Sequence, residues 1–587
     1  MKDHNHTLAS IFRQMADCYK YLGTEHRFRT IAYERAARTM LSLKQDVSAF
    51  ASDIDSLDKL KGVGESIAEK IMEFLNTGRI RTFEKLKAEV PTALLDLMEI
   101  NGMGPATTRS LHEQLGINNK EELVSALETG KLSGLKGFGE KKIENIRKAL
   151  KISKETGNRM LLDEALQTGE SLLQKVISIR GVKKAELAGS LRRMKETVGD
   201  IDLIVASDPA DKKNIIRKFT GLDAVESIIA AGETKASVML HSPSVQADIR
   251  VVDTKEYGAA LLYFTGSKEH NIQLRTMARE KDWKINEYGL FENKTGSRLC
   301  SESENDMYKT LGMPFIEPEM REDKGEIQLA LNGKLSILVN LSDIRGDMQM
   351  HSNWSDGSSD IESIARHVMQ HYPAYDYIVM TDHSPSSKIA GGLTPEDFHR
   401  QFQEIDSINE KIGRRFIKKG VEVDILPDGS LDLDDQMLKS FEWITASIHN
   451  GFTSDNTKRL ISACDHPLVD CIGHPSGRLI GKRNPYPVDW NAVFQKASEK
   501  NIVIEINAQP QRLDMHDDLV REAMMAGVMM SISTDAHDLS QFDFMRLGVS
   551  VARRGWCGKE NILNTKSWAD ISNFRKSRRE KNHELIK

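Results

Sequence analysis

The period of the hydrophobic and polar positions changes several times along the chain. Within the first 50 residues, apolar side chains recur every three or four positions, which predicts amphipathic helices. Two later apolar runs, which begin near Asp200 and Asp248, have the β-branched character of strands. From residue 346 onward, short apolar segments typical of strands alternate with segments that have the spacing of helices. We therefore predict a multidomain α/β protein whose N-terminal part is helical.

The N-terminal helices are interrupted by a repeated Gly-x-Gly turn. The glycines are Gly62 and Gly64, Gly102 and Gly104, and Gly137 and Gly139. Two glycines let the backbone approach a ligand closely, and they expose N–H groups at the start of the next helix, where a phosphate binds. A plain helical repeat would also place glycine at such junctions and stays as the alternative. The copies resemble helix-hairpin-helix motifs, which hold a DNA backbone without reading its bases.

Composition limits the class of protein. The chain has 587 residues, of which 39% are hydrophobic and 28% are charged, as expected of a soluble protein with several domains. It has no apolar run of about 20 residues and no signal-peptide pattern, and its five scattered cysteines include no CxxC pair, so we expect a reducing cytoplasm.

A net charge of −5 gives no overall signature of nucleic-acid binding, so such binding would need local basic clusters. The candidates are Lys136, Lys141, Lys142, Arg147, Lys148, Lys151 and Lys154, and a tail of Arg575, Lys576, Arg578, Arg579 and Lys581. A solvated helix face would explain either cluster almost as well.

Candidate chemistry lies at the two acidic strand starts. Asp200 and Asp202 are two residues apart and share one face of a strand, where they repel each other unless a positive charge intervenes. Hard oxygen ligands suit Mg²⁺ or Mn²⁺. Asp248 would complete a two-metal site for phosphoryl transfer, and Gly189-Ser190 offers N–H groups and a hydroxyl to a phosphate. Because a lone Asp-x-Asp is more often a solvated strand edge, the prediction of nucleotidyl transfer depends on the joint pattern.

This region resembles the catalytic part of DNA polymerase family X, the family of polymerase beta. The motifs that match in order and spacing are Gly189-Ser190-x-Arg192-Arg193, Gly199-Asp200-x-Asp202, Asp248-Ile249-Arg250, Tyr263-Phe264-Thr265-Gly266-Ser267 and Ile285-Asn286-Glu287-Tyr288. The resemblance implies a nucleotidyltransferase palm with a mixed sheet, in which Asp200, Asp202 and Asp248 are the catalytic metal ligands. It implies nucleotide contacts for Gly189, Ser190, Arg193, Gly199, Tyr263, Phe264, Gly266, Asn271 and Arg275. Gln246 departs from the family member compared, which has arginine there, so less positive charge supports Asp248.

The same resemblance extends to the N-terminal helices, where family members can carry a deoxyribose-phosphate lyase that works through a lysine Schiff base. Lys70 matches that lysine, and Tyr33 matches a nearby tyrosine. Ser66 replaces a basic family residue, so we expect a weakened phosphate pocket. An exposed helix lysine that pairs with neighbouring glutamates would explain Lys70 equally well.

Residues 346–587 place histidines and carboxylates at the ends of successive strands. Chemistry at the C-terminal strand ends is typical of a (βα) barrel, and imidazole with carboxylate suits Zn²⁺, Mn²⁺ or Fe. The segment resembles the polymerase and histidinol phosphatase (PHP) domain, a distorted (βα) barrel that binds up to three ions. The implied ligands are His351, Asp356, His383, Glu422, His449, His474, Asp535 and His537. Gln349 stands where the family usually has another histidine, so we expect one metal to be weakly held.

Together the resemblances cover nearly the whole chain and match bacterial members of family X. They divide it into a helical N-terminal domain (1–88), helix-hairpin-helix fingers (89–155), palm (156–255), thumb (256–318), linker (319–345) and PHP domain (346–587).

The function implied is synthesis by a monomer at short gaps during DNA repair, with 3′–5′ exonuclease action by the PHP domain. The implied partners are gapped or primer-template DNA and dNTPs, in a bacterial cytoplasm near the nucleoid and away from membranes. Two alternatives stay open. One is a 3′-end nuclease or phosphatase that uses the polymerase part to hold DNA, and the other is a catalytically silent DNA scaffold.

Overall fold

The computed structural model describes residues 4–584, apart from 44–45, 52, 61, 91, 99–102, 134, 136–137, 141, 145, 148–149 and 151–158. The chain separates into two compact units. One comprises residues 1–156 with 481–483, and the other comprises 157–480 with 484–587. In its described part, no helix is long and apolar enough to cross a membrane.

The described secondary structure of the first unit is helical, as expected from its periodicity. Its α-helices are α1 (His4–Leu22), α2 (Arg27–Ser42), α3 (Ile54–Asp58), α4 (Glu65–Thr77), α5 (Arg81–Glu89), α6 (Thr92–Met98), α7 (Pro105–Leu115) and α8 (Lys120–Glu128). Apolar side chains from all these segments form one core. Gly64 and Gly104 stand directly before α4 and α7, whereas Gly102 and Gly137 lie outside the described residues.

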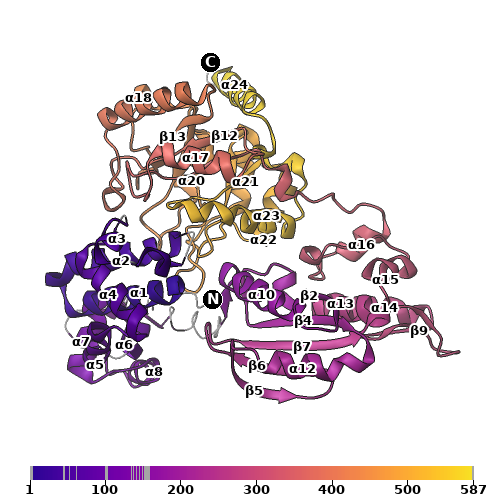
Figure 1. Cartoon of the computed structure of the whole chain (residues 1–587). Helices are drawn as coiled ribbons and strands as arrows, with labels where there is room; N and C mark the ends of the chain where they lie inside the picture. The colour runs from indigo at the N-terminus through magenta and orange to yellow at the C-terminus, as the bar shows by residue number, and fades with distance from the viewer. Residues whose placement is uncertain are drawn as a thin grey trace. The chain divides into compact units, whose positions relative to one another are not determined.

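The second unit begins with a mixed five-stranded sheet in the order β2-β4-β7-β6-β5 (Figure 1). Its elements are β1 (Met160–Leu161), α10 (Leu162–Ile177), β2 (Val182–Leu187), α11 (Gly189–Arg192), β3 (Thr197–Val198), β4 (Asp200–Ser207), α12 (Lys212–Thr220), β5 (Val225–Ala231), β6 (Lys235–Leu240) and β7 (Gln246–Asp253). Strands β4 and β7 run parallel, and the other neighbours run antiparallel. The expected mixed sheet of the palm is confirmed.

The two faces of strand β4 follow from the alternation of its side chains. Ile201, Leu203 and Val205 belong to the large core that includes residues of α10 and α12. Ile204 faces the other side and packs with Leu261 of α13 (Tyr257–Thr265). Because side chains alternate, the even-numbered Asp200 and Asp202 lie on this second face, at the end of β4 that α13 leaves open.

The segment after the palm forms a smaller helical and β layer with its own core. It contains α13, α14 (Lys268–Glu280), β8 (Trp283–Asn286), β9 (Gly289–Glu292), β10 (Arg298–Cys300), α15 (Glu304–Leu311) and α16 (Glu326–Leu331). The start of the expected linker packs into this layer. Buried Arg321 pairs with Glu304 at 2.6 Å, and buried Glu326 hydrogen-bonds with His270 at 2.7 Å. Residues 319–326 are therefore not an open joint, because their buried charges have fixed partners.

The C-terminal part is a seven-stranded parallel sheet in the order β11 to β17. Its strands are β11 (Gly346–Asp347), β12 (Tyr377–Met380), β13 (Ile417–Asp424), β14 (Trp443–Ser447), β15 (Cys471–Ile472), β16 (Val503–Asn507) and β17 (Met530–Ser533). A parallel bridge between Met350 and Ala536 brings the first and last strands together. The expected distorted (βα) barrel is confirmed.

Helices fill the connections of the barrel (Figure 1). They are α17 (Ile361–His371), α18 (Pro395–Ile412), α19 (Asp435–Leu438), α20 (Thr457–Asp465), α21 (Trp490–Lys500) and α22 (Asp517–Met525), and α23 (Met545–Arg554) and α24 (Trp568–Glu584) follow the last strand. Buried apolar residues of palm and barrel form one continuous cluster. Two ion pairs cross the same boundary, between Arg478 and Glu196 at 2.7 Å and between Arg546 and Glu170 at 3.0 Å.

The basic tail of the chain lies in α24 and is largely structural. Arg575 and the fully buried Arg578 pair with Asp470 at 2.7 and 2.6 Å, and Arg579 donates to the carbonyl of Leu468 at 3.0 Å. These arginines neutralise a buried carboxylate. They are therefore a poor DNA-binding cluster, contrary to one of the two interpretations of the tail.

Candidate active sites

The three predicted acids of the palm meet at the end of two parallel strands. In the β4–β7 register Asp202 lies opposite Asp248. Asp200 lies two residues before Asp202 on the same face of β4. Their carboxylate oxygens lie within 4.8 Å of one another. This distance lets a common cation contact all three.

The charge of this cluster fits a divalent metal. Burial, followed by the charges of Asp200 and Asp248, raises the pKa of Asp202 to about 7. One oxygen of Asp248 accepts a hydrogen bond from Gln246 Nε2 at 2.9 Å. The other oxygen, Oδ1, is buried and has no hydrogen-bond partner among the described residues. Gln246 thus supports Asp248 with an amide dipole where sequence comparison expected only a loss of charge.

The phosphate-binding turn lies against the acids. Gly189 begins α11 with φ of +60°, and a Cβ there would overlap with Oδ2 of Asp202. Glycine is therefore required both by the backbone conformation and by the close approach. Gly199 lies beside Arg159, whose guanidinium donates to the side chain and carbonyl of Thr197 at 3.0 and 2.6 Å. The sequence analysis missed Arg159, which precedes the motifs.

The predicted nucleotide contacts lie around the end of α13. Tyr263 and Phe264 are in its last turn rather than in a loop, and their rings meet edge to face. Asn271 Nδ2 donates to the carbonyl of Tyr263 at 2.7 Å. Tyr263, Asn271 and Arg275 line one pocket together with Asn286. The structure therefore brings three of the predicted nucleotide contacts to a single pocket.

Arg193 and Gly266 meet on the phosphate side of the same region. Arg193 Nη1 donates to the carbonyl of Thr265 at 2.5 Å, and a Cβ on Gly266 would lie 3.2 Å from that nitrogen. Ser190 follows Gly189 in the first turn of α11.

The predicted ligands of the barrel converge at the C-terminal ends of its strands. Their nitrogen and oxygen atoms form three overlapping groups, each within 4.8 Å. The groups are His351, Asp356, His383 and His537; His383, Glu422 and His449; and His351, Glu422 and Asp535. His474 joins them through its Nε2, which lies 2.8 Å from a Glu422 oxygen. All the predicted ligands therefore surround one centre.

Several buried imidazole nitrogens at this centre make no hydrogen bond to the described residues. Nδ1 of His351, His383 and His474 is buried and makes no hydrogen bond within the described part of the chain. Burial alone would lower the pKa of His351, but the hydrogen bond to Asp535 and the surrounding carboxylates raise it to about 10. Unpaired imidazole nitrogens beside buried carboxylates fit divalent metal ions.

A second layer of residues orients these ligands, and the sequence analysis did not assign it. Asp424 lies 2.6 Å from Nδ1 of His449 and fixes the direction of its other nitrogen. Asp424 follows Glu422 by two positions, so alternation along β13 was the available signal. Asn507 Nδ2 donates to Asp535 at 3.0 Å, and Glu505 accepts a hydrogen bond from the backbone of His474 at 2.6 Å.

Gln349 differs from its neighbours at the barrel centre. Its side chain is completely buried, and neither amide atom has a hydrogen-bond partner among the residues described. A Cβ on Gly473 would lie 3.5 Å from its oxygen. The expected weakening of one metal position at Gln349 stays a prediction.

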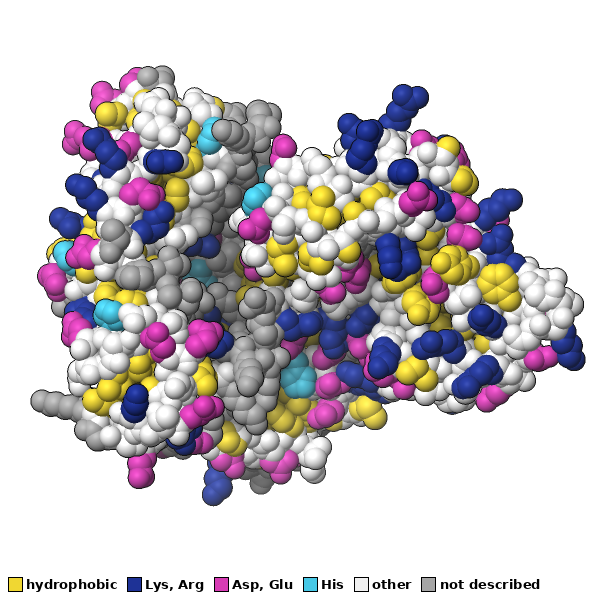
Figure 2. Space-filling view, turned by 90° about the horizontal axis from the view of Figure 1, so that it is seen from below, with side chains coloured by type: hydrophobic (Ala, Val, Ile, Leu, Met, Phe, Trp, Pro, Cys, Tyr) yellow, Lys and Arg dark blue, Asp and Glu magenta, His cyan; other side chains and the backbone are white. Residues whose placement is uncertain are grey.

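Three glycines of the turns in the first unit have open space beside them, whereas Gly62 has a φ of +86° and would place a Cβ 3.0 Å from Oγ1 of Thr39. A Cβ built on Gly64, Gly104 or Gly139 would meet no atom within 4 Å. Crowding within the protein therefore does not explain these glycines, and another molecule has room to approach the backbone. Figure 2 shows Lys and Arg side chains interspersed with Asp and Glu side chains, so no single basic field marks this face.

Lys70 is hydrogen-bonded within α4, whereas Tyr33 is part of the core. The Lys70 ammonium donates to the carbonyl and hydroxyl of Ser66 at 2.8 and 2.9 Å, and its partial burial lowers its pKa, which favours the neutral amine. Tyr33 is buried and stacks on Tyr19 at 5.6 Å.

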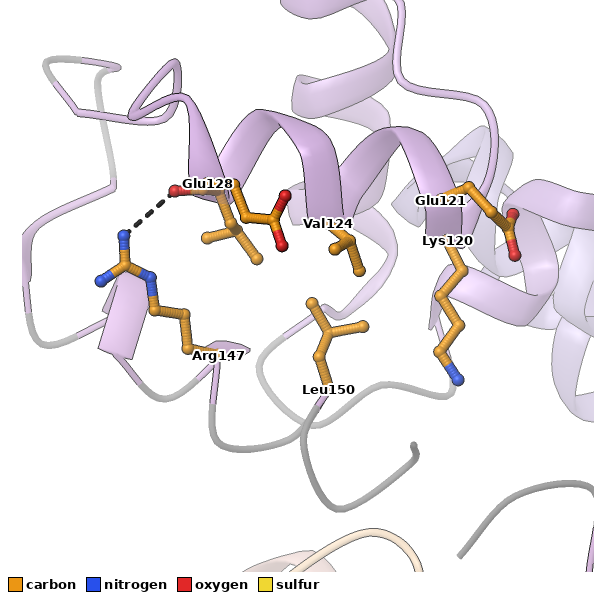
Figure 3. A pocket seen from close by; sticks show the side chains of 7 residues that line it. Lys120, Glu121, Val124, Glu128, Arg147 and Leu150 are labelled. Atoms are coloured by element: carbon orange, nitrogen blue, oxygen red, sulfur yellow. Dashed lines mark hydrogen bonds between the residues drawn. The ribbon is translucent and has the colours of Figure 1, made fainter. Parts of the chain in front are cut away.

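The first unit also contains a pocket of about 680 Å³ (Figure 3). Val124, Leu127 and Leu150 form its apolar lining. Arg147, one of the candidate basic residues, donates a hydrogen bond from Nη2 to the carbonyl of Leu127 at 3.0 Å. Of the same candidate cluster, Lys136, Lys141, Lys148, Lys151 and Lys154 lie outside the described residues. The described lining carries no group of metal ligands, so we place the chemistry in the palm and barrel.

Comparison with known proteins identifies the family. A DNA polymerase beta thumb model matches residues 260–322, a helix-hairpin-helix domain model matches 3–80, and a SAM-like helix-hairpin-helix tandem model matches 94–151. A protein of Bacillus subtilis (strain 168) named DNA polymerase/3′-5′ exonuclease PolX is 37% identical over 564 residues, which are 95% of this chain and 97% of that protein. The chain belongs to the family X DNA polymerases.

Eukaryotic members of family X match a smaller part of the chain. DNA polymerase lambda of Rattus norvegicus is 25% identical over 335 residues, which are 52% of this chain and 54% of the relative. DNA polymerase lambda of Arabidopsis thaliana is 26% identical over 356 residues, 54% of this chain and 62% of the relative. The full-length match to the bacterial PolX protein confirms the predicted membership of the bacterial branch.

Proposed function

We propose that this family X polymerase fills short gaps in DNA at the palm and trims 3′ ends by 3′–5′ exonuclease action at the barrel. The observation that carries the proposal is the β4–β7 register, which joins the half-buried Asp202 and Asp248 with the exposed Asp200 in one carboxylate cluster. The name of the Bacillus subtilis relative, which combines the two activities, supports the pairing.

In the palm, the three acids would hold two divalent ions, for which Mg²⁺ or Mn²⁺ is the best match to carboxylate oxygen. Such ions supply positive charge to the attacking and leaving oxygens of an in-line displacement. The 3′-oxygen of the primer bonds to the α-phosphorus of a dNTP, its proton passes to solvent, and the bond to pyrophosphate breaks. The turn at Gly189 and the guanidinium of Arg193 would hold the triphosphate in line.

At the barrel, the imidazole and carboxylate groups would hold Mn²⁺, Zn²⁺ or Fe. Metal ions there supply positive charge and an activated water when bound. A water oxygen would bond to phosphorus at the last phosphodiester while the bond from that phosphorus to the 3′-oxygen of the preceding nucleotide breaks, and this 3′-oxygen would leave with a proton. Asp424 would keep His449 in the tautomer that leaves its ligand nitrogen free.

The helical first unit would hold the duplex by its phosphates. The open glycine turns present backbone N–H groups without a sequence-reading side chain. Binding should therefore weaken steeply with salt, by about tenfold or more between 50 and 200 mM, as phosphate contacts release counterions. Monomeric state, nucleoid association and lyase action through Lys70 stay predictions.

Two single substitutions in the full chain test the assignment. On a gapped duplex with Mg²⁺ or Mn²⁺, Asp200→Ala should abolish nucleotide incorporation and leave removal of 3′-terminal nucleotides unchanged. His383→Ala should do the reverse. Each variant is the control for the other. Both must also retain binding to gapped DNA.

Gap filling that survives Asp200→Ala would refute the palm assignment. The nuclease interpretation, in which the polymerase part only holds DNA, would instead be favoured if the unmodified chain removed 3′-terminal nucleotides but incorporated none. Absence of both activities in the unmodified chain with Mg²⁺ or Mn²⁺, with binding to gapped DNA retained, would favour a silent scaffold.

A further inference from the structure

A buried arginine of the barrel reaches the phosphate side of the polymerase site. Arg554 is the last residue of α23, and its side chain is 3% exposed. Its Nη1 donates to the carbonyl of Arg193 at 2.7 Å and to Oε1 of Glu322 at 3.0 Å. Its Nη2 donates to Asp517, in the first turn of α22. One guanidinium thus ties two barrel helices to the loop that follows α11.

Glu322 is shared between this arginine and the nucleotide-binding arginine. The same oxygen, Oε1, accepts from Arg554 Nη1 at 3.0 Å and from Arg193 Nε at 3.1 Å. Burial would raise the pKa of Glu322, but Arg554 and Arg193 lower it, so the group is a carboxylate. A single negative charge therefore lies between two guanidinium groups.

The position of the Arg193 side chain follows from these contacts. Its Nε is held by Glu322 and its Nη1 by the carbonyl of Thr265 at 2.5 Å. Within the described part of the chain, its Nη2 donates to no other group. That donor, together with the second hydrogen on Nη1, is available to a bound anion.

We propose that Arg554 is a positioning residue for nucleotide binding in the polymerase reaction. It holds the backbone of Arg193 through the carbonyl, and it takes part of the Glu322 charge, which would otherwise be shared only between the Arg193 guanidinium at 3.1 Å and the Lys195 ammonium at 3.9 Å. The proposal rests on the proposed function, because it takes the triphosphate to be the ligand of Arg193. It makes a residue of the barrel part of the machinery of the palm.

The physical basis is preorganisation. A guanidinium that is already oriented loses less freedom when it binds a phosphate, and a shared carboxylate competes less strongly for it. Without Arg554, Glu322 would keep only Arg193 and the more distant Lys195 as partners, and the Arg193 carbonyl would lose its donor. The cost falls on nucleotide binding rather than on the chemical step, because Arg554 does not contact the acids.

The experiment compares Arg554→Gln with Arg553→Gln in the full chain. Arg553 is the neighbouring arginine of α23, and it pairs with Glu319 at 2.7 Å and with the carbonyl of Val339 at 3.1 Å, outside the nucleotide loop. In gap filling with a single dNTP, we expect Arg554→Gln to raise the KM for dNTP about tenfold. Its kcat, its affinity for gapped DNA and its nuclease rate should stay within about twofold of the unmodified chain. Arg553→Gln should leave the KM unchanged.

A second substitution separates positioning from loss of packing. Glu322→Gln added to Arg554→Gln removes the competing charge, so it should restore at least part of the dNTP affinity. A purely structural role predicts no such rescue. If thermal unfolding shows that Arg554→Gln is not folded, Arg554→Lys is measured in its place. Lysine keeps the charge but lacks the planar fork that joins three acceptors.

The outcomes are distinct. An unchanged KM in a folded Arg554 variant, or equal KM shifts in the Arg553 and Arg554 variants, would overturn the proposal. If the unmodified chain incorporates no nucleotide, the proposed function fails instead, and the Arg554 proposal falls with it.

Discussion

Gln349 provides a sharp test of how the barrel binds metal. Its amide is completely buried beside the histidine and carboxylate cluster, and it has no hydrogen-bond partner in the described part of the chain. We predict that Gln349 is not a metal ligand. Gln349→Leu should then stabilise the metal-free protein without changing its bound metal, and Gln349→His should increase the bound metal.

The magnitude follows from the cost of unpaired polar atoms. A buried donor or acceptor without a partner costs about 1–3 kcal/mol. Leucine has a similar volume and no polar atom, and local repacking recovers part of the amide's cost. We therefore expect Gln349→Leu to stabilise the metal-free protein by about 1–3 kcal/mol, which raises the Tm by about 2–4 °C per kcal/mol for a domain of this size.

The assay has two readouts on the full chain. Thermal unfolding of the chelator-treated protein gives the change in Tm, and elemental analysis after loading with Mn²⁺ or Zn²⁺ gives the bound metal. Gln401→Leu is the matched control. Gln401 is equally buried in the barrel, but its Nε2 donates to Asp382 at 2.6 Å, so this substitution should lower the Tm.

Two results would refute the reasoning. If Gln349→Leu lost bound metal to the extent that His383→Ala does, the amide oxygen would be a ligand. If Gln349→Leu lowered the Tm of the metal-free protein as Gln401→Leu does, the amide would have partners that the contact geometry does not show. An unchanged metal content in Gln349→His would contradict the expectation that histidine completes the site.

Two further predictions concern single atoms of the two sites. Gly189→Ala should lower gap filling by at least about 100-fold, because a methyl group would overlap with Asp202 and displace a catalytic carboxylate. Gly232→Ala, whose Cβ would meet only ordinary contacts at 3.7 Å, should leave gap filling unchanged, and equal losses in both variants would contradict the argument. Asp424→Asn should lower nuclease activity or metal affinity about 10–100-fold without affecting gap filling, because His449 loses the carboxylate that orients it. An unchanged nuclease rate and metal content would show that His449 is oriented by other groups.

Much of the fold and of both sites was predictable from local pattern. The period-two alternation placed Asp200 and Asp202 on one face of a strand, and the repeated acid or histidine at strand ends predicted a barrel with one metal centre. The barrel and the shared face of Asp200 and Asp202 are confirmed, because side-chain direction in a strand depends only on position along it, whereas the metal centre stays a prediction. The motifs of the family then indicated which residues, far apart in the chain, belong to the same site. No local pattern could show this.

Other features depended on contacts between distant segments. Residues 319–326 looked like a joint because they are acidic and contain proline and glycine, yet Arg321 and Glu326 are buried in the thumb. The basic tail looked like a nucleic-acid contact, yet Arg578 neutralises a buried Asp470. Charge along a sequence does not show which charge is buried, because that depends on the partner which the fold supplies.

The sequence by itself determined the elements, the identity of the chemical groups and the strand faces that carry them, since each follows from residue type and spacing. Only the tertiary structure decided the register that sets Asp202 opposite Asp248, the hydrogen bond from Gln246 and the link from Arg554 to Arg193. The reason is that distance between groups far apart in the chain depends on how sheets and helices pack. Packing is a property of the whole folded chain.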